Sequence, residues 1–189
     1  MKYSKKIGKQ EWTTLNLNVV VFSNGDPINE IKTKEEWIIA NKEGRPGWCF
    51  YNNDKENEQI YGRLYNWYAV TDERGICPKG WHIPSDNEWG ELIESIGGYK
   101  KAGKLMKSNS LWQESCNLGN NQSEFNVFPS GYRNFYGDFF FLQQHAYFWS
   151  KTEHYNHLAW YHTMDFMTDE VLRYYNVKGN GFPCRCIRD

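Results

Sequence analysis

The chain has 189 residues, enough for one domain with a substantial core, and 17% of its residues are aromatic. Its 22 basic and 23 acidic residues give a net charge of −1, so no overall charge attracts nucleic acid or an anionic membrane. No apolar run is long enough to span a bilayer, and the basic N-terminal segment lacks the apolar core of a signal peptide. Two origins stay open: synthesis in the cytoplasm, or removal of a leader with a non-native Met1.

The first half of the chain predicts short helices and strands. Residues 11–17 alternate between polar and apolar side chains, as in a strand. Thr33 and Glu36 have capping-box spacing, so we expect a helix that begins there and ends at Gly44. Residues 47–51 predict a short strand or extended segment.

The clearest predicted element is a helix that begins after residue 85. Ser85 and Glu88 form a second capping box, and apolar residues then recur at helical spacing up to Ile96. The glycine pair at 97–98 ends this helix. The periodicity of residues 61–70 fits either a short aromatic helix or an extended insert.

From about residue 111 onward, glycine, asparagine and serine separate short aromatic runs, which predict strands joined by turns and long loops. These runs are residues 125–128, 131–133, 138–142, 147–150, 158–162, 171–175 and 183–187. Helices in the first half and strands in the second predict an α+β fold. Since no repeat, low-complexity tract or linker interrupts the chain, we expect residues 1–189 to form a single domain.

Five segments of the chain, taken in order, resemble the Fibrobacter succinogenes major paralogous domain (FISUMP). They are residues 61–70 (YGRLYNWYAV), 77–89 (CPKGWHIPSDNEW), 129–133 (PSGYR), 149–153 (WSKTE) and 184–189 (CRCIRD). The resemblance covers nearly the whole chain and implies a C-type-lectin-like fold, related to the formylglycine-generating-enzyme variant of that fold. Such a fold has a few short helices, a small twisted antiparallel sheet, paired N- and C-terminal strands and long irregular loops.

The resemblance also implies a bacterial origin and an extracellular or cell-surface location. It predicts that residues 11–17 pair with residues 182–188, and that the middle of the chain supplies loops on a rigid base. Variable loops on such a base are a common way to build a binding face.

Five cysteines are too few for a disulfide scaffold, and one or two bridges at most are expected. The cysteines are Cys49, Cys77, Cys116, Cys184 and Cys186. Cys184 and Cys186 share one face of a predicted strand, so they do not easily bond each other. Two alternatives stay open for this pair: a copper-binding thiolate pair, as in the formylglycine-generating enzyme, or a structural role in which Cys186 bridges to Cys77. The spacing of the pair departs from that of the enzyme.

We expect the ligand-binding surface between residues 145 and 180, where aromatic rings and amides are dense. The candidate residues are Tyr155, Asn156, Trp160, His162, Tyr174, Tyr175, Asn176 and Asn180. For Trp149 and Trp160 we favour a place in the core over exposure at this surface. Arg133 and Asp138 are lesser candidates for the same surface.

The calcium-binding motifs of many C-type lectins do not occur in this sequence, and we predict no cofactor. Asp54, Glu56 and Glu58 are a weak calcium candidate, because hard oxygens suit this ion but the spacing is not that of an ordered loop. We therefore expect a non-enzymatic module that recognises a glycan or a protein at a bacterial surface. The alternatives are an enzyme of the formylglycine-generating type and a structural adhesin or tail-tip component.

Overall fold

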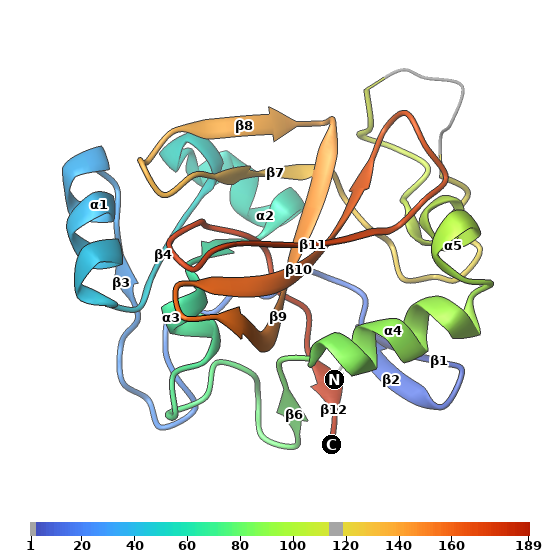
Figure 1. The fold of residues 1–189 in the computed structure, drawn as a ribbon, viewed down its shortest axis with the longest axis horizontal. Helices are drawn as coiled ribbons and strands as arrows, with labels where there is room; N and C mark the ends of the chain where they lie inside the picture. Colours follow the sequence, from blue (N-terminus) through green and yellow to red (C-terminus); the bar gives the residue numbers. More distant parts are fainter. Residues whose placement is uncertain (1–2, 114–118) are drawn as a thin grey trace.

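The computed structural model describes residues 3–113 and 119–189, and within them the fold is α+β (Figure 1). The α-helices are α1 (Lys34–Glu43), α2 (Glu58–Tyr61), α3 (Trp67–Val70), α4 (Asp86–Ser95) and α5 (Tyr99–Met106), with two 3-10 turns at Tyr51–Asn53 and Lys55–Asn57. The strands are β1 (Ser4–Ile7), β2 (Gln10–Thr13), β3 (Asn29–Glu30), β4 (Gly47–Cys49), β5 (Leu64–Tyr65), β6 (Trp81–His82), β7 (Ser130–Arg133), β8 (Phe139–Leu142), β9 (His145–Tyr155), β10 (Leu158–Asp165), β11 (Leu172–Val177) and β12 (Ile187–Arg188).

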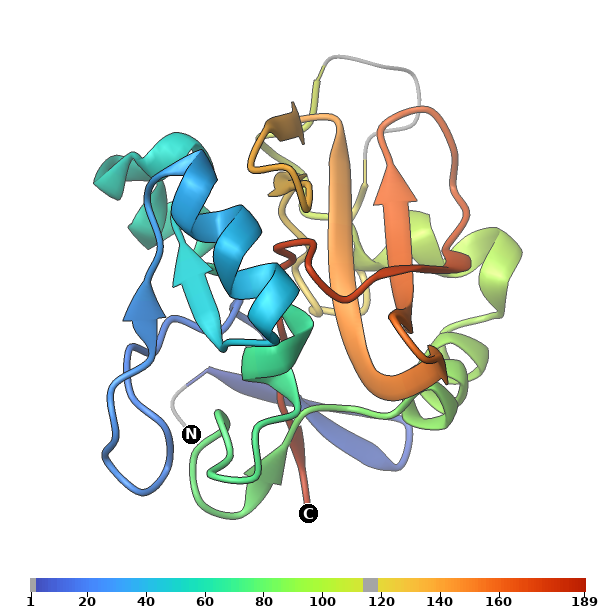
Figure 2. The ribbon, with the colours of Figure 1, turned by 60° about the vertical axis from the view of Figure 1, so that its left-hand side comes forward.

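The described strands form several small sheets, where the sequence predicted one. In order, the sheets are β1-β2-β12-β6, β11-β10-β9, β3-β4-β5 and β7-β8, and the neighbours are antiparallel except for β3 and β4. Most strands have only two to four residues because turns interrupt them, so they cannot extend one common ladder. Figure 2 shows α1 and the β3-β4-β5 sheet on one side of the molecule, and β9, β10, α4 and α5 on the other.

The two ends of the chain pair with each other, as predicted. Trp12 of β2 is the register partner of Ile187 in β12. Beyond this pair, the Leu17 N–H donates to the Cys184 carbonyl at 2.8 Å, so the contact continues along both segments. The predicted strand 11–17 is longer than the observed one: only its residues 11–13 have regular strand geometry, and they belong to β2 (Gln10–Thr13).

A disulfide joins Cys77 to Cys186 across 109 residues of sequence. It ties the segment before β6 to the last strand, and it is the bridge expected under the structural alternative for Cys186. Cys49 and Cys184 are buried free thiols, and Cys116 lies outside the described residues.

The predicted helix starts and stops are confirmed at α1 and α4. Thr33 accepts a hydrogen bond from the Glu36 N–H, and Ser85 forms a reciprocal capping box with Glu88. Gly44 ends α1 in the left-handed conformation, at φ 67°. The 61–70 segment proves to be mixed: the end of α2 leads into the short strand β5 and then the single turn α3.

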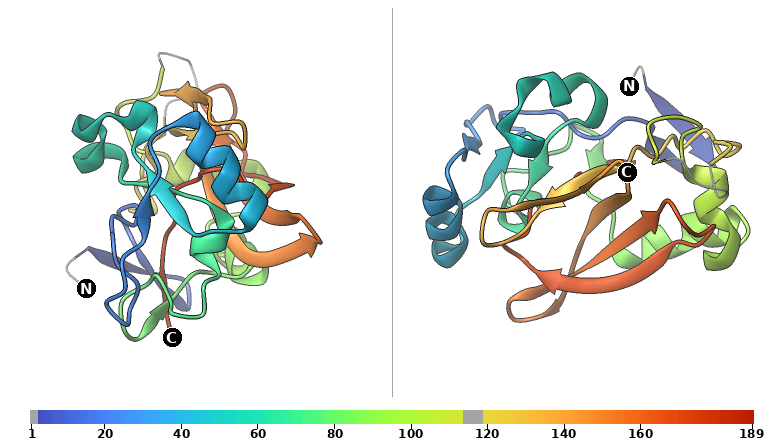
Figure 3. Two further views of the ribbon diagram at one scale, coloured as in Figure 1. Left: turned by 90° about the vertical axis from the view of Figure 1, so that its left-hand side faces the viewer. Right: turned by 90° about the horizontal axis from the view of Figure 1, so that it is seen from above.

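In the β11-β10-β9 sheet, whose course Figure 3 shows, the first half of β9 and most of β10 are buried on both faces, whereas β11 is largely exposed. On one face Tyr147 and Trp149 of β9 pack with Phe182 and other core residues. On the other face Phe148 packs with Trp89 of α4. Consecutive residues of a strand point to opposite faces, so this one strand contributes to two separate cores.

Arg133, a lesser candidate for the binding surface, is fully buried and has a structural role. Its guanidinium donates to the carbonyls of Ile31 at 2.6 Å and of Lys32 and Thr33 at 3.0 Å each. Asp138 forms an ion pair with Lys34. Both side chains therefore connect the β7–β8 hairpin to the start of α1.

Removing the disulfide should destabilise the protein without changing its fold. A bridge that closes a loop of this length stabilises by about 5 kcal/mol, mainly by restricting the unfolded chain. We expect the Cys77→Ala/Cys186→Ala variant to lose about that much free energy of unfolding in urea titrations. Reductant should lower the stability of the wild type similarly and leave the variant unchanged. Equal stability of variant and wild type would contradict a structural role for the bridge.

Candidate functional site

Seven ring side chains form a continuous band, here called the aromatic row, across β7 to β11. Its members are Tyr132, Phe140, Phe141, His145, Tyr147, Tyr161 and Tyr174. Neighbouring ring centroids lie 4.7 to 6.3 Å apart along the row. These are distances at which aromatic rings contact one another. The β7–β8 hairpin lies beside β9, which brings its rings next to those of the sheet (Figures 1 and 3).

The row combines a buried base with an exposed rim. Tyr147 and Tyr161 are each only 8% exposed, whereas Phe140 is 39%, Phe141 42% and Tyr174 51% exposed. Phe141 also has a φ of 62°, in the left-handed region that bulky residues rarely adopt. Phe141 is therefore held at the surface by the hairpin at a conformational cost.

The row is uncharged at neutral pH and offers hydrogen-bonding groups. Burial raises the pKa of Tyr132 and Tyr147, and it raises that of Tyr161 to about 12, so these hydroxyls stay protonated. Burial lowers the pKa of His145, although nearby Asp165 acts in the opposite direction. The Tyr161 hydroxyl is hydrogen-bonded to the Asn176 side chain. The row can thus present aromatic faces, phenol hydroxyls and a neutral imidazole to a ligand.

The two adjacent tyrosines among the predicted site residues point to opposite faces of the sheet. Tyr174 is the register partner of Tyr161, and Tyr175 is the register partner of Trp160. They are 51% and 50% exposed, so both reach solvent, but only Tyr174 belongs to the aromatic row. One ligand-binding surface cannot include both rings.

A second cluster occupies the other face, around Trp160. His154 stacks on Tyr175 at 4.1 Å, and the Arg173 guanidinium lies 3.4 Å from the Trp160 ring centroid. Trp160 is half-buried, while the predicted core residue Trp149 is fully buried. Two further predicted residues, Tyr155 and Asn156, are exposed at the β9–β10 turn.

His162 and Asn180, also predicted for the binding surface, lie in the interior at 0% and 3% exposure. His162 stacks against Trp89 at 5.2 Å, and its Nε2 lies 3.2 Å from the Asp86 carboxylate. Arg173 binds the same carboxylate with two nitrogens, the closest at 2.6 Å. These side chains connect β10 and β11 to the start of α4, so His162 is a structural residue.

Burial lowers the pKa of His162, and this outweighs the opposite effect of Asp86. Burial disfavours the Asp86 carboxylate, but hydrogen bonds from His162 and Arg173 prevail and lower its pKa to about 2. The imidazole is therefore neutral at pH 7 and donates its Nε2 hydrogen to an ionised carboxylate.

Of the seven members of the row, the sequence-based candidates include only Tyr174, and Tyr132, Phe140 and Phe141 lie outside the predicted 145–180 region altogether. A signal was present, because residues 138–142 contain three consecutive phenylalanines (DFFFL). In a strand such a run cannot be buried on one face, so at least one ring must point away from that face. What joins this run to Tyr132 is the hairpin register, in which Tyr132 pairs with Phe140.

The weak calcium candidates do not converge. One Asp54 oxygen accepts a hydrogen bond from the Glu56 N–H at 3.0 Å, and Glu58 pairs with Arg63 at 2.8 Å. Over residues 3–113 and 119–189 there is no group of three or more His, Cys, Asp or Glu side chains placed to hold a metal ion.

Cys184 and Cys186, the pair considered as copper ligands of a formylglycine-generating type of enzyme, are not both free thiols. Cys186 is committed to the disulfide, and burial raises the pKa of the fully buried Cys184 thiol far above neutrality. A soft metal requires thiolates, which this arrangement does not offer.

The chain matches the family model of the Fibrobacter succinogenes major domain over residues 6–188, and it belongs to this family. The match therefore spans both the terminal pairing and the aromatic row. No curated protein and no solved structure matches the chain. In the described part of the chain, none of the helices is both long and apolar enough to cross a membrane.

The buried His162 predicts that acid destabilises the fold. The pKa of His162 is lower in the folded than in the unfolded state, where it is about 6.5. The contribution of the neutral His162 to the free energy of unfolding is therefore complete above pH 6.5 and is lost as the pH falls below that value. We expect the free energy of unfolding to decrease between pH 7.5 and 5, and the His162→Gln variant to show a shallower decrease. Some slope should remain, because the pKa of His145 is also lowered.

The matched control is His157→Gln, which replaces an exposed ring in the turn between β9 and β10. It should retain the full pH dependence of the wild type in urea titrations at each pH. If His162→Gln and the wild type have the same slope, His162 is not a neutral buried base.

Proposed function

We propose that the chain is a non-enzymatic binding module with a C-type-lectin-like fold, and that it holds a neutral glycan on the aromatic row. The fold proposal is supported by the pairing of β2 with β12, the few short helices and the long connections between small sheets. The observation that carries the ligand proposal is the continuous band of uncharged rings across five strands.

A sugar needs two kinds of contact at once. Its C–H faces pack against aromatic rings, and its hydroxyls need donors and acceptors at fixed positions. The exposed rings of Phe140 and Phe141 supply the first, and the hydroxyls of Tyr132 and Tyr174 with the His145 imidazole supply the second. The row has no ionic group of its own to select a charged ligand.

We also propose that the protein works outside the reducing cytoplasm, at a bacterial surface. The Cys77–Cys186 disulfide supports this location, since such bonds persist in oxidising compartments. The family membership is compatible with it.

Single substitutions of the two adjacent tyrosines test which face binds. Tyr174→Ala removes a rim ring of the aromatic row, whereas Tyr175→Ala removes an equally exposed ring of the opposite face. On an array of neutral and charged glycans, we expect the wild type and Tyr175→Ala to bind uncharged glycans. Tyr174→Ala should bind about tenfold more weakly, the effect of a ring worth about 1.4 kcal/mol.

The reverse pattern, with binding lost in Tyr175→Ala and kept in Tyr174→Ala, would place the site on the Trp160 cluster instead. If no glycan binds but a purified surface protein binds the wild type and not Tyr174→Ala, the row recognises protein. Both variants should keep the melting temperature of the wild type within a few degrees, since both rings are half exposed.

A further inference from the structure

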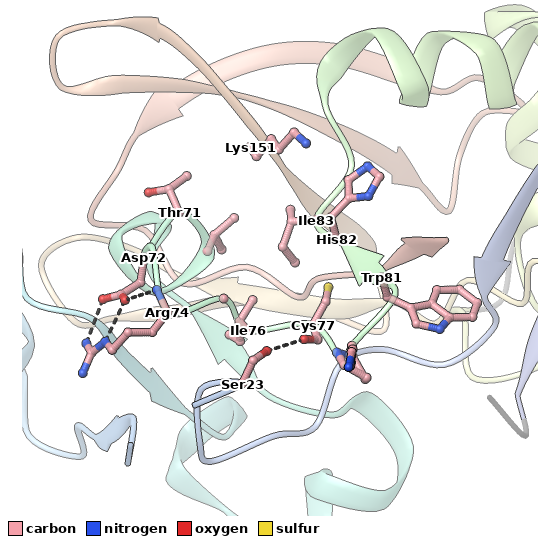
Figure 4. A pocket seen from close by; sticks show the side chains of 14 residues that line it. Ser23, Thr71, Asp72, Arg74, Ile76, Cys77, Trp81, His82, Ile83 and Lys151 are labelled. Atoms are coloured by element: carbon pink, nitrogen blue, oxygen red, sulfur yellow. Dashed lines mark hydrogen bonds and ion pairs between the residues drawn. The ribbon is translucent and has the colours of Figure 1, made fainter. Parts of the chain in front are cut away.

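A pocket of about 500 Å³ lies away from the aromatic row, between α3, the chain segment before β6 and the middle of β9 (Figure 4). Its volume is within the range of small-molecule sites. Three of the five segments that carry the family resemblance meet here, because the lining includes Val70, Cys77 and Lys151. The proposed function makes no use of this convergence.

The base of the pocket is apolar. Val70, Ile76 and Ile83 line it and are only 3 to 5% exposed. Figure 4 shows Ile83 in the middle of the view and Ile76 beside Cys77, whose disulfide to Cys186 fixes this part of the wall. The half-buried Pro78 and Trp81 also line the pocket, so a ligand that covered this base would remove mainly their apolar surface from water, which is favourable at about 25 cal/mol per Å².

Of the positively charged side chains that line the pocket, one forms ion pairs and two do not. Arg74 donates to Asp72 at 2.8 Å and to Asp26 at 3.1 Å, so its charge is compensated (Figure 4). Lys79 and Lys151 are exposed and have no ion-pair partner within residues 3–113 and 119–189. The Lys151 N–H donates to the Pro84 carbonyl at 2.9 Å, which fixes the point where its side chain leaves β9.

His82 borders the pocket but is engaged elsewhere. Its two ring nitrogens lie 2.8 Å from Glu88 and 2.6 Å from Asp189. Asp72 is the one carboxylate among the lining residues, and Arg74 already neutralises it. Among the lining side chains, the uncompensated charge is thus that of Lys79 and Lys151.

We propose that this pocket binds a small amphiphilic carboxylate, with its apolar chain on Val70, Ile76 and Ile83 and its anionic head near Lys79 and Lys151. The apolar base complements the chain of such a molecule, and the uncompensated positive charge complements its carboxylate. A ligand that has only the chain or only the carboxylate would use half of the site. This site is independent of the proposed glycan surface, because no residue of the aromatic row lines it.

Three ligands of related structure separate the two contributions. Octanoate carries both the chain and the charge, octanamide carries the chain without the charge, and acetate carries the charge with almost no chain. We expect octanoate to shift the NMR methyl signals of Ile76 and Ile83 in a saturable titration at millimolar concentrations. Octanamide should bind roughly three- to tenfold more weakly, and acetate should cause no shift of these methyls.

The Lys79→Gln/Lys151→Gln variant should lose the preference for octanoate and bind both octyl ligands equally. Its matched control is Lys100→Gln/Lys101→Gln, which removes two exposed lysines of α5 and the same net charge. The control variant and Tyr174→Ala should bind octanoate as the wild type does.

The proposal is overturned if octanoate causes no saturable shift, or if octanamide binds the wild type as tightly as octanoate. It is also overturned if the Lys100/Lys101 control loses the preference equally, since the effect would then be one of net charge. Loss of glycan binding in Tyr174→Ala has no bearing on these results, so the two proposals fail separately.

Discussion

The alternation of side chains along β9, β10 and β11 is the constraint on which the rest of the structure depends. Consecutive residues point to opposite faces, and each face of this sheet has its own partner. One face packs on Phe182 and continues into the aromatic row, and the other packs on Trp89 of α4. A slip of one residue in register would exchange the two sets of rings, which explains why the core and the candidate site are fixed together.

Buried polar contacts hold the elements around this sheet in place. The Asp86 carboxylate at the start of α4 receives hydrogen bonds from His162 of β10 and Arg173 of β11. Arg133 similarly joins the β7–β8 hairpin to the carbonyls before α1. Such groups are tolerated in an interior only when they are hydrogen-bonded, so they specify one arrangement of helices and hairpin around the sheet. The position of the β7–β8 hairpin, with Tyr132 beside Tyr147 of β9, follows from that arrangement.

The two proposed sites differ in chemistry because different parts of the fold build them. The aromatic row is formed by strand faces, where ring follows ring and ionic groups are few. The pocket near Cys77 is formed where a helical turn, an irregular segment and one strand meet, so its lining combines apolar side chains with two exposed lysines. The disulfide stabilises the second region by tying it to the last strand. The two proposed ligands, a neutral glycan and an amphiphilic anion, would therefore bind to separate surfaces of the chain.

The sequence by itself determined the local features: the capping boxes of Thr33 and Ser85, the α+β order of elements, and, through its motifs, the family. Each depends on residues close in sequence or on recognisable segments. Only the tertiary structure decided that Tyr174 and Tyr175 serve opposite faces, that His162 is buried beside Asp86, and that Phe140 and Phe141 join the row. These outcomes depend on strand register and on contacts between residues far apart in the chain, and short aromatic runs do not encode either of them.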